Sequence, residues 1–333
     1  MSEFLNALRG KPVGRFPIWL MRQAGRYMPQ YRAIRKRVSN FVELCLNPEL
    51  AVEITLLPEK LLGVDALILF SDILIPLIPM GIEVEFKKGE GPHLKAPSVE
   101  DWKRFDPEGV KEVFETVRGV KKRSKLPLIG FSGAPFTLAA YIFEGKTARE
   151  YREIRKLFYK DRKTFHKALE RLADTLAVYL NKQVEAGADA LQIFDSWAGI
   201  MSPQLFEEYR PHLEGLIERV KEKHPDVPII YFFRGGHLFE LAKKLPADAI
   251  SVDWTVNLEK ALRETDKTLQ GNLDPTVLYA DNETIKNEVQ NLLSRVAAVR
   301  KTKYIFNLGH GLAPDMELEK VRLLVETVKG FRL

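Results

Sequence analysis

The stretch Pro17-Ile18-Trp19-Leu20-Met21-Arg22-Gln23-Ala24-Gly25-Arg26-Tyr27-Met28-Pro29 contains a short apolar run followed at once by charged residues. The apolar run predicts a buried β-strand, and Gly25 and Pro29 break any regular continuation. Arg22 and Arg26 then lie at the end of that strand, with no carboxylate near them in the sequence. A guanidinium binds carboxylates and phosphates through two hydrogen bonds and stays charged at any working pH. The pattern therefore indicates a site for a multiply anionic small molecule.

The same arrangement, a short apolar run that ends in a polar residue, recurs along the chain and predicts eight strands. These are Phe16–Met21, Ala66–Phe70, Leu126–Phe131, Ala190–Phe194, Pro228–Phe233, Ala249–Val252, Thr268–Asn272 and Lys303–Leu308. Helical patterns lie at Pro48–Leu62, Pro107–Lys122, in two segments within Pro135–Ala186, and at Pro203–Lys223, His237–Lys244, Leu258–Glu264, Asn282–Arg300 and Met316–Lys329. Strands that alternate with helices indicate a parallel sheet. Eight such units favour a closed (β/α)8 barrel over an open doubly wound sheet.

Two insertions explain why the 333 residues exceed the roughly 250 that are typical of this barrel. After the second strand, Ile82–Phe86 alternates in polarity, Lys87–Pro92 is a predicted turn, and His93–Lys95 is its partner, which together predict a β-hairpin. The second insertion is the helical stretch Thr137–Ala186 between strands three and four. With no internal repeat, residues 1–333 are predicted to form a single barrel domain.

Composition excludes several classes of protein. The 51 basic and 45 acidic residues leave a net charge of +6, which attracts anions but is too small to indicate nucleic acid without a basic stripe. A single cysteine, Cys45, excludes an intramolecular disulfide and a thiolate metal cluster and fits a reducing compartment. Residues 66–80 are too short and too interrupted to span a bilayer. The sequence predicts a cytoplasmic protein with no membrane or nucleic-acid partner.

Polar residues follow almost every predicted strand, and packing alone does not explain them. This matters because barrels of this type carry their chemistry at the carboxyl ends of the strands. In strand order the residues are Arg22, Ser71 and Asp72, Ser132, Asp195 and Ser196, Arg234 and His237, Asp253, Asp274, and His310.

Each strand-end residue also has a purely structural interpretation. A carboxylate within the apolar sequence around Asp72 is costly unless it is paired, so a ligand contact is favoured over a loop contact there. Asp274 is predicted to cap the following helix. For Asp195 and Asp253, capping and ligand binding remain equally open. Arg234 is expected to pair with one of these aspartates.

His310 lies between two glycines, a frame that a core histidine rarely needs, so it is predicted to face a ligand. The alternative is that the glycines form a phosphate cup, which is common after the last strands of this barrel. The six histidines lack zinc-site spacing, and no serine lies in a nucleophile elbow. No metal site and no acyl-transfer chemistry are therefore expected.

Four blocks of sequence resemble one enzyme family: Pro17–Tyr31, Phe70–Leu74, Phe131–Thr137 with its continuation to Tyr141, and Asn307–Gly311. A fifth block, Phe194–Gly199, is similar but less strict. The blocks are spread over almost the whole chain, in the order of the uroporphyrinogen decarboxylase family. The first block, with Met-Arg-Gln-Ala-Gly-Arg-Tyr, is close to diagnostic of this family, whereas the others alone are weak.

The resemblance implies a homodimeric enzyme without a cofactor that decarboxylates the four acetate side chains of uroporphyrinogen III and yields coproporphyrinogen III. By matching position, Asp72 would accept hydrogen bonds from the pyrrole N–H groups. The residues that would bind carboxylates or line the pocket are Arg22, Arg26, Arg35, Tyr141, Phe194, Ser196 and His310. Asp72, Arg22 and Tyr141 would be catalytic. Arg22 would chiefly bind charge. The general acid stays open between Arg22, whose high pKa makes it a poor proton donor, and Tyr141 or a water that it holds.

Two other functions fit the same barrel. A tetrapyrrole carrier or sensor would need the arginines but would gain little from a central anion, so Asp72 argues against it. Corrinoid-linked methyl transfer to a thiol uses a zinc-bound thiolate with a His-x-Cys pattern, and Cys45 has no such neighbour.

Overall fold

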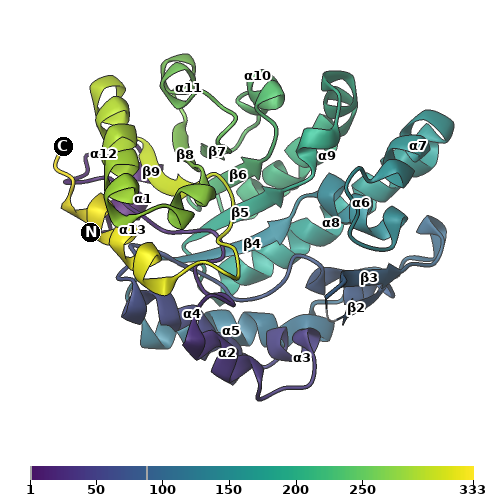
Figure 1. Ribbon diagram of the computed structural model, residues 1–333. Helices are drawn as coiled ribbons and strands as arrows, with labels where there is room; N and C mark the ends of the chain where they lie inside the picture. The colour runs from purple at the N-terminus through teal and green to yellow at the C-terminus, as the bar shows by residue number, and fades with distance from the viewer. Residues whose placement is uncertain (1, 88) are drawn as a thin grey trace.

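The computed structural model describes residues 2–87 and 89–333. Its main feature is a curled parallel sheet of seven strands in the order β1-β4-β5-β6-β7-β8-β9, with helices on its outer side (Figure 1). The strands are β1 Leu67–Ile68, β4 Leu128–Gly133, β5 Ala190–Asp195, β6 Ile229–Phe233, β7 Ala249–Ser251, β8 Thr268–Leu273 and β9 Tyr304–Leu308. This is the predicted parallel α/β architecture, and seven of the eight predicted strands are present.

The predicted first strand is not a regular strand in the structure. Residue Ile18 forms one isolated parallel bridge with Phe306 of β9, and its carbonyl accepts a hydrogen bond from the backbone N–H of Asp65 at 2.8 Å. The segment therefore lies between β9 and β1. Its backbone N–H groups bond to side chains instead of a ladder: that of Ile18 donates to the Asp65 carboxylate at 2.8 Å, and that of Met21 donates to Oδ1 of Asn307 at 3.1 Å.

The helices mostly follow the predicted pattern. The α-helices are α1 Glu3–Leu8, α2 Pro29–Arg35, α3 Phe41–Cys45, α4 Pro48–Leu61, α5 Lys111–Arg123, α6 Pro135–Glu144, α7 Arg152–Lys160, α8 Arg162–Ala186, α9 Pro203–Lys223, α10 Phe239–Ala242, α11 Leu258–Glu264, α12 Asn282–Val299 and α13 Leu318–Gly330. The 3₁₀ turns are η1 Ile75–Met80, η2 Val99–Asp101, η3 Pro107–Val110, η4 Ala198–Ile200, η5 Gly236–Leu238 and η6 Pro275–Tyr279. The helices α1, α2 and α3 were not predicted, because five to seven residues carry little periodicity.

The stretch between β4 and β5 contains three helices rather than the two that were predicted. The α6 helix ends at Gly145, whose φ of 75° is the left-handed conformation that glycine adopts most easily. The boundary between α7 and α8 is a single residue, Asp161, whose side chain accepts a hydrogen bond from the N–H of Thr164 at 3.0 Å. That cap starts a new helix inside a continuous amphipathic pattern.

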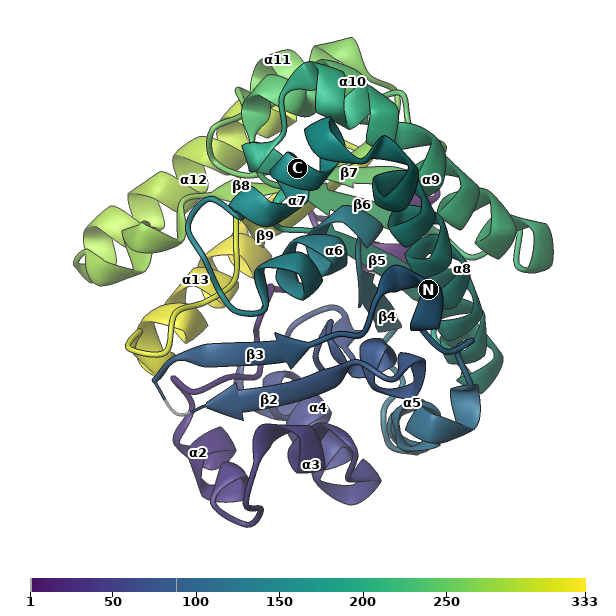
Figure 2. The ribbon, with the colours of Figure 1, turned by 90° about the vertical axis from the view of Figure 1, so that its right-hand side faces the viewer.

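The predicted hairpin is formed by β2 (Glu83–Lys87) and β3 (Gly91–Lys95), which pair antiparallel with Glu83 opposite Lys95. It lies apart from the curled sheet, against α3 and α6 (Figure 2). The predicted turn includes Lys88, which lies outside the described residues.

A separate apolar cluster fills the inside of the curled sheet and includes Phe4 and Leu8 of α1 together with Trp19, Ile230 and Ile305. The carbonyl of Ala7 in α1 accepts a hydrogen bond at 2.8 Å from Thr268, the first residue of β8. The α1 helix therefore covers the end of the sheet at which the strands begin. The opposite end, where the strands terminate, carries the polar residues.

Candidate active site

Arg22 adopts a left-handed backbone with φ 59°, which is uncommon for a residue with a side chain. Its side chain lies against Gly311, where a Cβ atom would be only 2.5 Å from Cδ of Arg22. No carboxylate of the described residues lies within ion-pair distance of Arg22. Its guanidinium is exposed and available to an anion from outside the protein.

Asp72 follows β1 and is half-buried. Its Oδ1 accepts a hydrogen bond from the backbone N–H of Leu74 at 2.9 Å. Burial raises the pKa of Asp72 to about 6, although the Leu74 N–H and the charge of Arg22 oppose that rise. A carboxylate with a raised pKa beside an arginine is the type of group that gathers at functional sites.

His310 completes this group from the segment after β9. Burial lowers the pKa of His310 to about 3, and the positive charges of Arg22 and Arg234 lower it further in the same direction. The imidazole is therefore neutral at neutral pH and can both donate and accept a hydrogen bond. Arg22 acts electrostatically on both Asp72 and His310, and the three residues were predicted from separate parts of the sequence.

Arg26 and Arg35 approach the same region from the two ends of α2. Burial raises the pKa of Tyr31, in α2, to about 12, and this pKa also responds to the charges of Arg35, Arg26 and Asp72. Arg35 donates a hydrogen bond to the carbonyl of Val38 at 3.0 Å. Tyr31 thus lies close enough to Arg26, Arg35 and Asp72 for their charges to act on it. It was not predicted as a site residue, because only its position at the end of the first block distinguishes it.

Phe194 lies in β5 within a row of aromatic side chains. Its ring centre is 5.7 Å from that of Phe131 and 5.8 Å from that of Phe232, and Phe232 in turn lies 6.1 Å from the ring of His310. The row provides an apolar wall between β4 and His310. This arrangement is compatible with the predicted pocket-lining role of Phe194.

Tyr141 belongs to a second aromatic group on α6. Its ring centre is 5.4 Å from that of Tyr151 and 6.1 Å from that of Trp197. Ser196 directly precedes Trp197 and is partly exposed. Among the described residues, neither Tyr141 nor Ser196 forms a hydrogen bond with Asp72, so their roles toward a substrate stay predictions.

The three other strand-end aspartates have structural partners. Asp195 is buried and accepts hydrogen bonds from Thr137 at 2.7 Å and Tyr231 at 2.8 Å, and burial raises its pKa to about 6. Asp253 accepts from the N–H groups of Gly235 and Thr255. Asp274 caps η6, as predicted.

Arg234 differs from the prediction. Its expected ion pair with an aspartate is absent from residues 2–87 and 89–333, and the guanidinium instead lies 5.7 Å from the centre of the Trp254 ring. The physical reason is that Asp253 and Asp195 are already engaged by the partners described above. The sequence signal was the same one that identified Arg22, an arginine directly after a buried strand.

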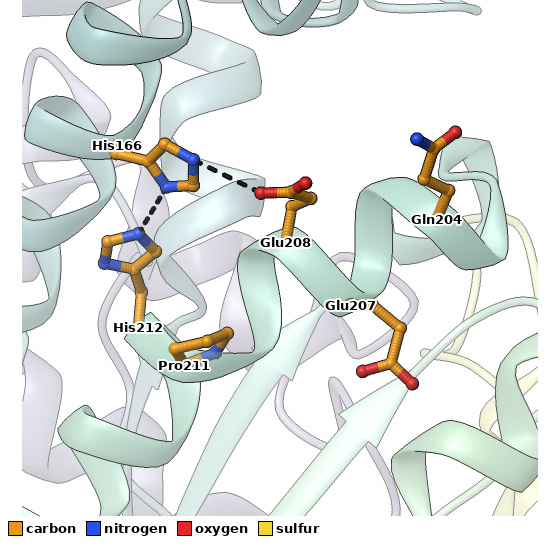
Figure 3. Close-up of a pocket in the computed structure, with 6 residues that line it drawn as sticks. All are labelled: His166, Gln204, Glu207, Glu208, Pro211 and His212. Carbon is orange, nitrogen blue, oxygen red and sulfur yellow. Dashed lines mark hydrogen bonds and ion pairs between the residues drawn. The ribbon is translucent and has the colours of Figure 1, made fainter.

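A hollow of about 360 Å³ lies elsewhere, between α8 and α9, and Figure 3 shows its lining. Nδ1 of His166 is 2.9 Å from Nε2 of His212, and Nε2 of His166 is 3.5 Å from the carboxylate of Glu208 (Figure 3). None of the predicted site residues lines this hollow. Within the described part of the chain, no three metal-ligating side chains are arranged to hold an ion, and no helix is long and apolar enough to cross a membrane.

These features define an enzyme of the α/β barrel-like class whose candidate site, at the strand ends, combines arginines with one half-buried carboxylate. The family model of uroporphyrinogen decarboxylase (URO-D) matches residues 1–331. The chain belongs to this family.

Curated relatives agree over nearly the full length. Uroporphyrinogen decarboxylase from Aquifex aeolicus is 50% identical, with 99% of this chain and 98% of that protein covered. The enzyme of the same name from Hydrogenobaculum sp. is 43% identical, with 98% and 95% covered. Among solved structures, a methyltransferase from Methanosarcina mazei has a TM-score of 0.82 at 21% identity, covering 98% of this chain and 97% of the other. At that identity the likeness establishes the fold alone and does not favour methyl transfer.

Proposed function

We propose that this protein decarboxylates the four acetate side chains of uroporphyrinogen III to give coproporphyrinogen III, a step of tetrapyrrole biosynthesis. The observation that carries the proposal is that the half-buried Asp72 and the neutral His310, at separate strand ends, both lie within the electrostatic reach of Arg22. Membership of the URO-D family over residues 1–331 supports the same reaction.

The substrate explains the combination of charges. Uroporphyrinogen III has eight carboxylates around its rim and four pyrrole N–H groups at its centre. Arg22, Arg26 and Arg35 supply guanidinium groups for rim carboxylates, and Asp72 supplies the acceptor for the N–H groups. Neutral His310, with Tyr141 and Ser196, would complete the contacts to the rim, and Phe194 would contact the apolar ring faces.

The chemistry uses the pyrrole ring itself as the electron sink. Protonation of a ring carbon next to an acetate gives a cationic intermediate, and loss of carbon dioxide neutralises it and leaves an exocyclic methylene. A second proton added to that methylene completes the methyl group, and release of the first proton from the ring carbon restores the pyrrole. Asp72 stabilises the positive charge because an ionised carboxylate held in a poorly solvated site acts without reorganisation, an effect often worth about 3 to 4 kcal/mol. Arg22 orients the reacting acetate, and Tyr141, or a water bound to it, donates the proton.

Three structural expectations belong to this proposal. Residues 16–21 occupy the position of the eighth strand and close a (β/α)8 barrel. The hydrogen bonds of residues 17 and 18 to β9 and to Asp65 support this expectation. Residues 1–333 act as a single domain in the cytoplasm. The enzyme works as a homodimer, as the family implies, which light scattering on the purified protein measures directly.

The test is anaerobic incubation of the purified protein with uroporphyrinogen III and a chelator, followed by oxidation and chromatography of the porphyrins. Products with seven, six, five and four carboxylates are expected despite the chelator. Unchanged eight-carboxylate material that co-elutes with the protein would refute the enzyme and leave a tetrapyrrole-binding protein.

A further inference from the structure

Arg234 directly follows β6 and is half-buried. Other half-buried arginines of this chain use their guanidinium donors inside the protein. Arg300 donates to the carbonyls of Leu262, Thr265 and Lys267. For Arg234, by contrast, the described chain provides neither a carbonyl nor a carboxylate within bonding distance of the guanidinium, only the ring of Trp254.

Asp253, just after β7, bonds to the backbone next to Arg234 and not to its guanidinium. One oxygen of Asp253 accepts from the N–H of Gly235 at 3.0 Å, and the other accepts from the N–H of Thr255 at 2.9 Å. Asp253 thereby ties the loop after β6 to the loop after β7. Arg234 lies in the first loop and Trp254 in the second, so the hydrogen bonds of Asp253 also keep these two side chains close to each other.

This pair borders the candidate active site. A Cβ atom on Gly309 would be 2.7 Å from the backbone nitrogen of Trp254, so Trp254 lies directly against the residue that precedes His310. Arg22 approaches the same segment through Gly311. Arg234 and Arg22 are therefore the two positive groups that act on His310, and they come from separate strand ends.

We propose that Arg234, supported by the face of Trp254, is a further carboxylate-binding residue of the active site and binds a rim carboxylate of the tetrapyrrole. The proposal rests on the function proposed above. An arginine against an aromatic face is pre-oriented and weakly hydrated, and its donors remain free for a carboxylate. Trp254 is 39% exposed, a high value for a residue of this size, which fits a side chain that a bound ligand covers.

The test compares Arg234→Met with Arg263→Met, because Arg263 is exposed on α11 and its loss removes the same charge from the surface. The KM for uroporphyrinogen III in Arg234→Met is expected to rise by about tenfold or more, the value of one charge-assisted hydrogen bond to a carboxylate, with kcat changed less. The Kd of the four-carboxylate product is expected to rise in parallel. Arg234→Lys is expected to recover part of the affinity, because it restores the charge without the planar fork.

An Arg234→Met enzyme with the KM and product Kd of Arg263→Met would overturn the proposal. Thermal unfolding of all three variants separates loss of affinity from loss of folding. If Arg234→Met is unfolded, the folded Arg234→Lys variant decides: wild-type KM and Kd would overturn the proposal, and a raised KM and Kd would support it. A wild-type protein that does not turn over uroporphyrinogen III would refute the proposed function instead, so the two failures are distinguishable.

Discussion

The raised pKa of Asp72 predicts that this residue costs stability in return for activity. In the folded protein its pKa is about 6, whereas the ordinary value is 3.8. Between these pH values the folded state holds a proton that the unfolded state releases, so stability falls as the pH rises from 3.8 to about 6. Well above pH 6 the folded protein carries the full loss of stability that comes from burying the ionised carboxylate. This sign is opposite to that of a carboxylate stabilised by an ion pair.

The magnitude follows from the same two values. At about 1.36 kcal/mol per pH unit, the interval corresponds to at most about 3 kcal/mol, and the partial exposure of the residue reduces it. Asp72→Asn removes the charge and keeps an oxygen that can accept from the Leu74 N–H. The variant is therefore expected to be about 1 to 3 kcal/mol more stable than wild type at pH 8 and equally stable near pH 4.

Urea unfolding at pH 4.5, 6 and 8 measures the difference in the free energy of unfolding between Asp72→Asn and wild type. The decarboxylation assay measures the activity that the charged carboxylate provides. Asp72→Asn is expected to lose most turnover, and wild-type kcat/KM is expected to fall below about pH 6 as the carboxylate becomes protonated. Asp226→Asn, at an exposed position between α9 and β6, is the matched control for the loss of one negative charge. A pH-independent stability difference, or near-normal turnover of Asp72→Asn, would refute the reasoning.

Three further perturbations test Arg22 and the segment that precedes it. Gly311→Ala places a Cβ 2.5 Å from Cδ of Arg22 and is expected to reduce kcat/KM by about tenfold or more with little change in unfolding temperature, whereas Gly330→Ala, with open space around it, leaves both unchanged. Arg22→Met removes a charge that lowers the Asp72 pKa, so the acidic limb of the residual kcat/KM profile should move to higher pH rather than stay in place. Asp65→Asn breaks a half-buried ion pair and is expected to lose about 3 kcal/mol or more in urea unfolding, and a loss near zero would contradict its role in holding residues 16–21.

The regular parts of the fold could be predicted because their local signals agree with their environment. The strand β5 and the helix α12 were predicted almost to the residue. For both elements the local pattern, an apolar run in the strand and an amphipathic repeat in the helix, agrees with the burial that the fold imposes. The segment 16–21 was predicted as a strand on the same pattern. It differs because the side chains of Asp65, Asn307 and Gln23 bond to its N–H groups, and the contacts with Asp65 and Asn307 are too distant in sequence to leave a local signal.

The candidate site was predictable in the same uneven way. Arg22, Asp72 and His310 were predicted as site residues because each is a polar residue just after an apolar run, and their roles stay predictions. Arg234 carried that same signal, yet the prediction assigned it an aspartate partner. Sequence alone cannot show that the backbone of Gly235 and Thr255 already uses Asp253. Which donors bond to a carboxylate depends on the folded chain, so only the structure could show that Asp253 is not the partner of Arg234.

The strand-end residues fall into two groups according to their partners within the folded chain. Asp195, Asp253 and Asp274 have hydrogen-bond donors from their own chain. Arg22, Asp72, His310 and Arg234 instead carry unfavourable features: a left-handed backbone at Arg22, desolvated Asp72 and His310, and at Arg234 a half-buried guanidinium for which residues 2–87 and 89–333 provide no acceptor. Folding alone would not retain four such features at one end of a sheet. The proposed ligand, with both carboxylates and N–H donors, would supply partners to Asp72, His310 and Arg234. We therefore expect the chemistry at the strand ends and not in the hollow between α8 and α9.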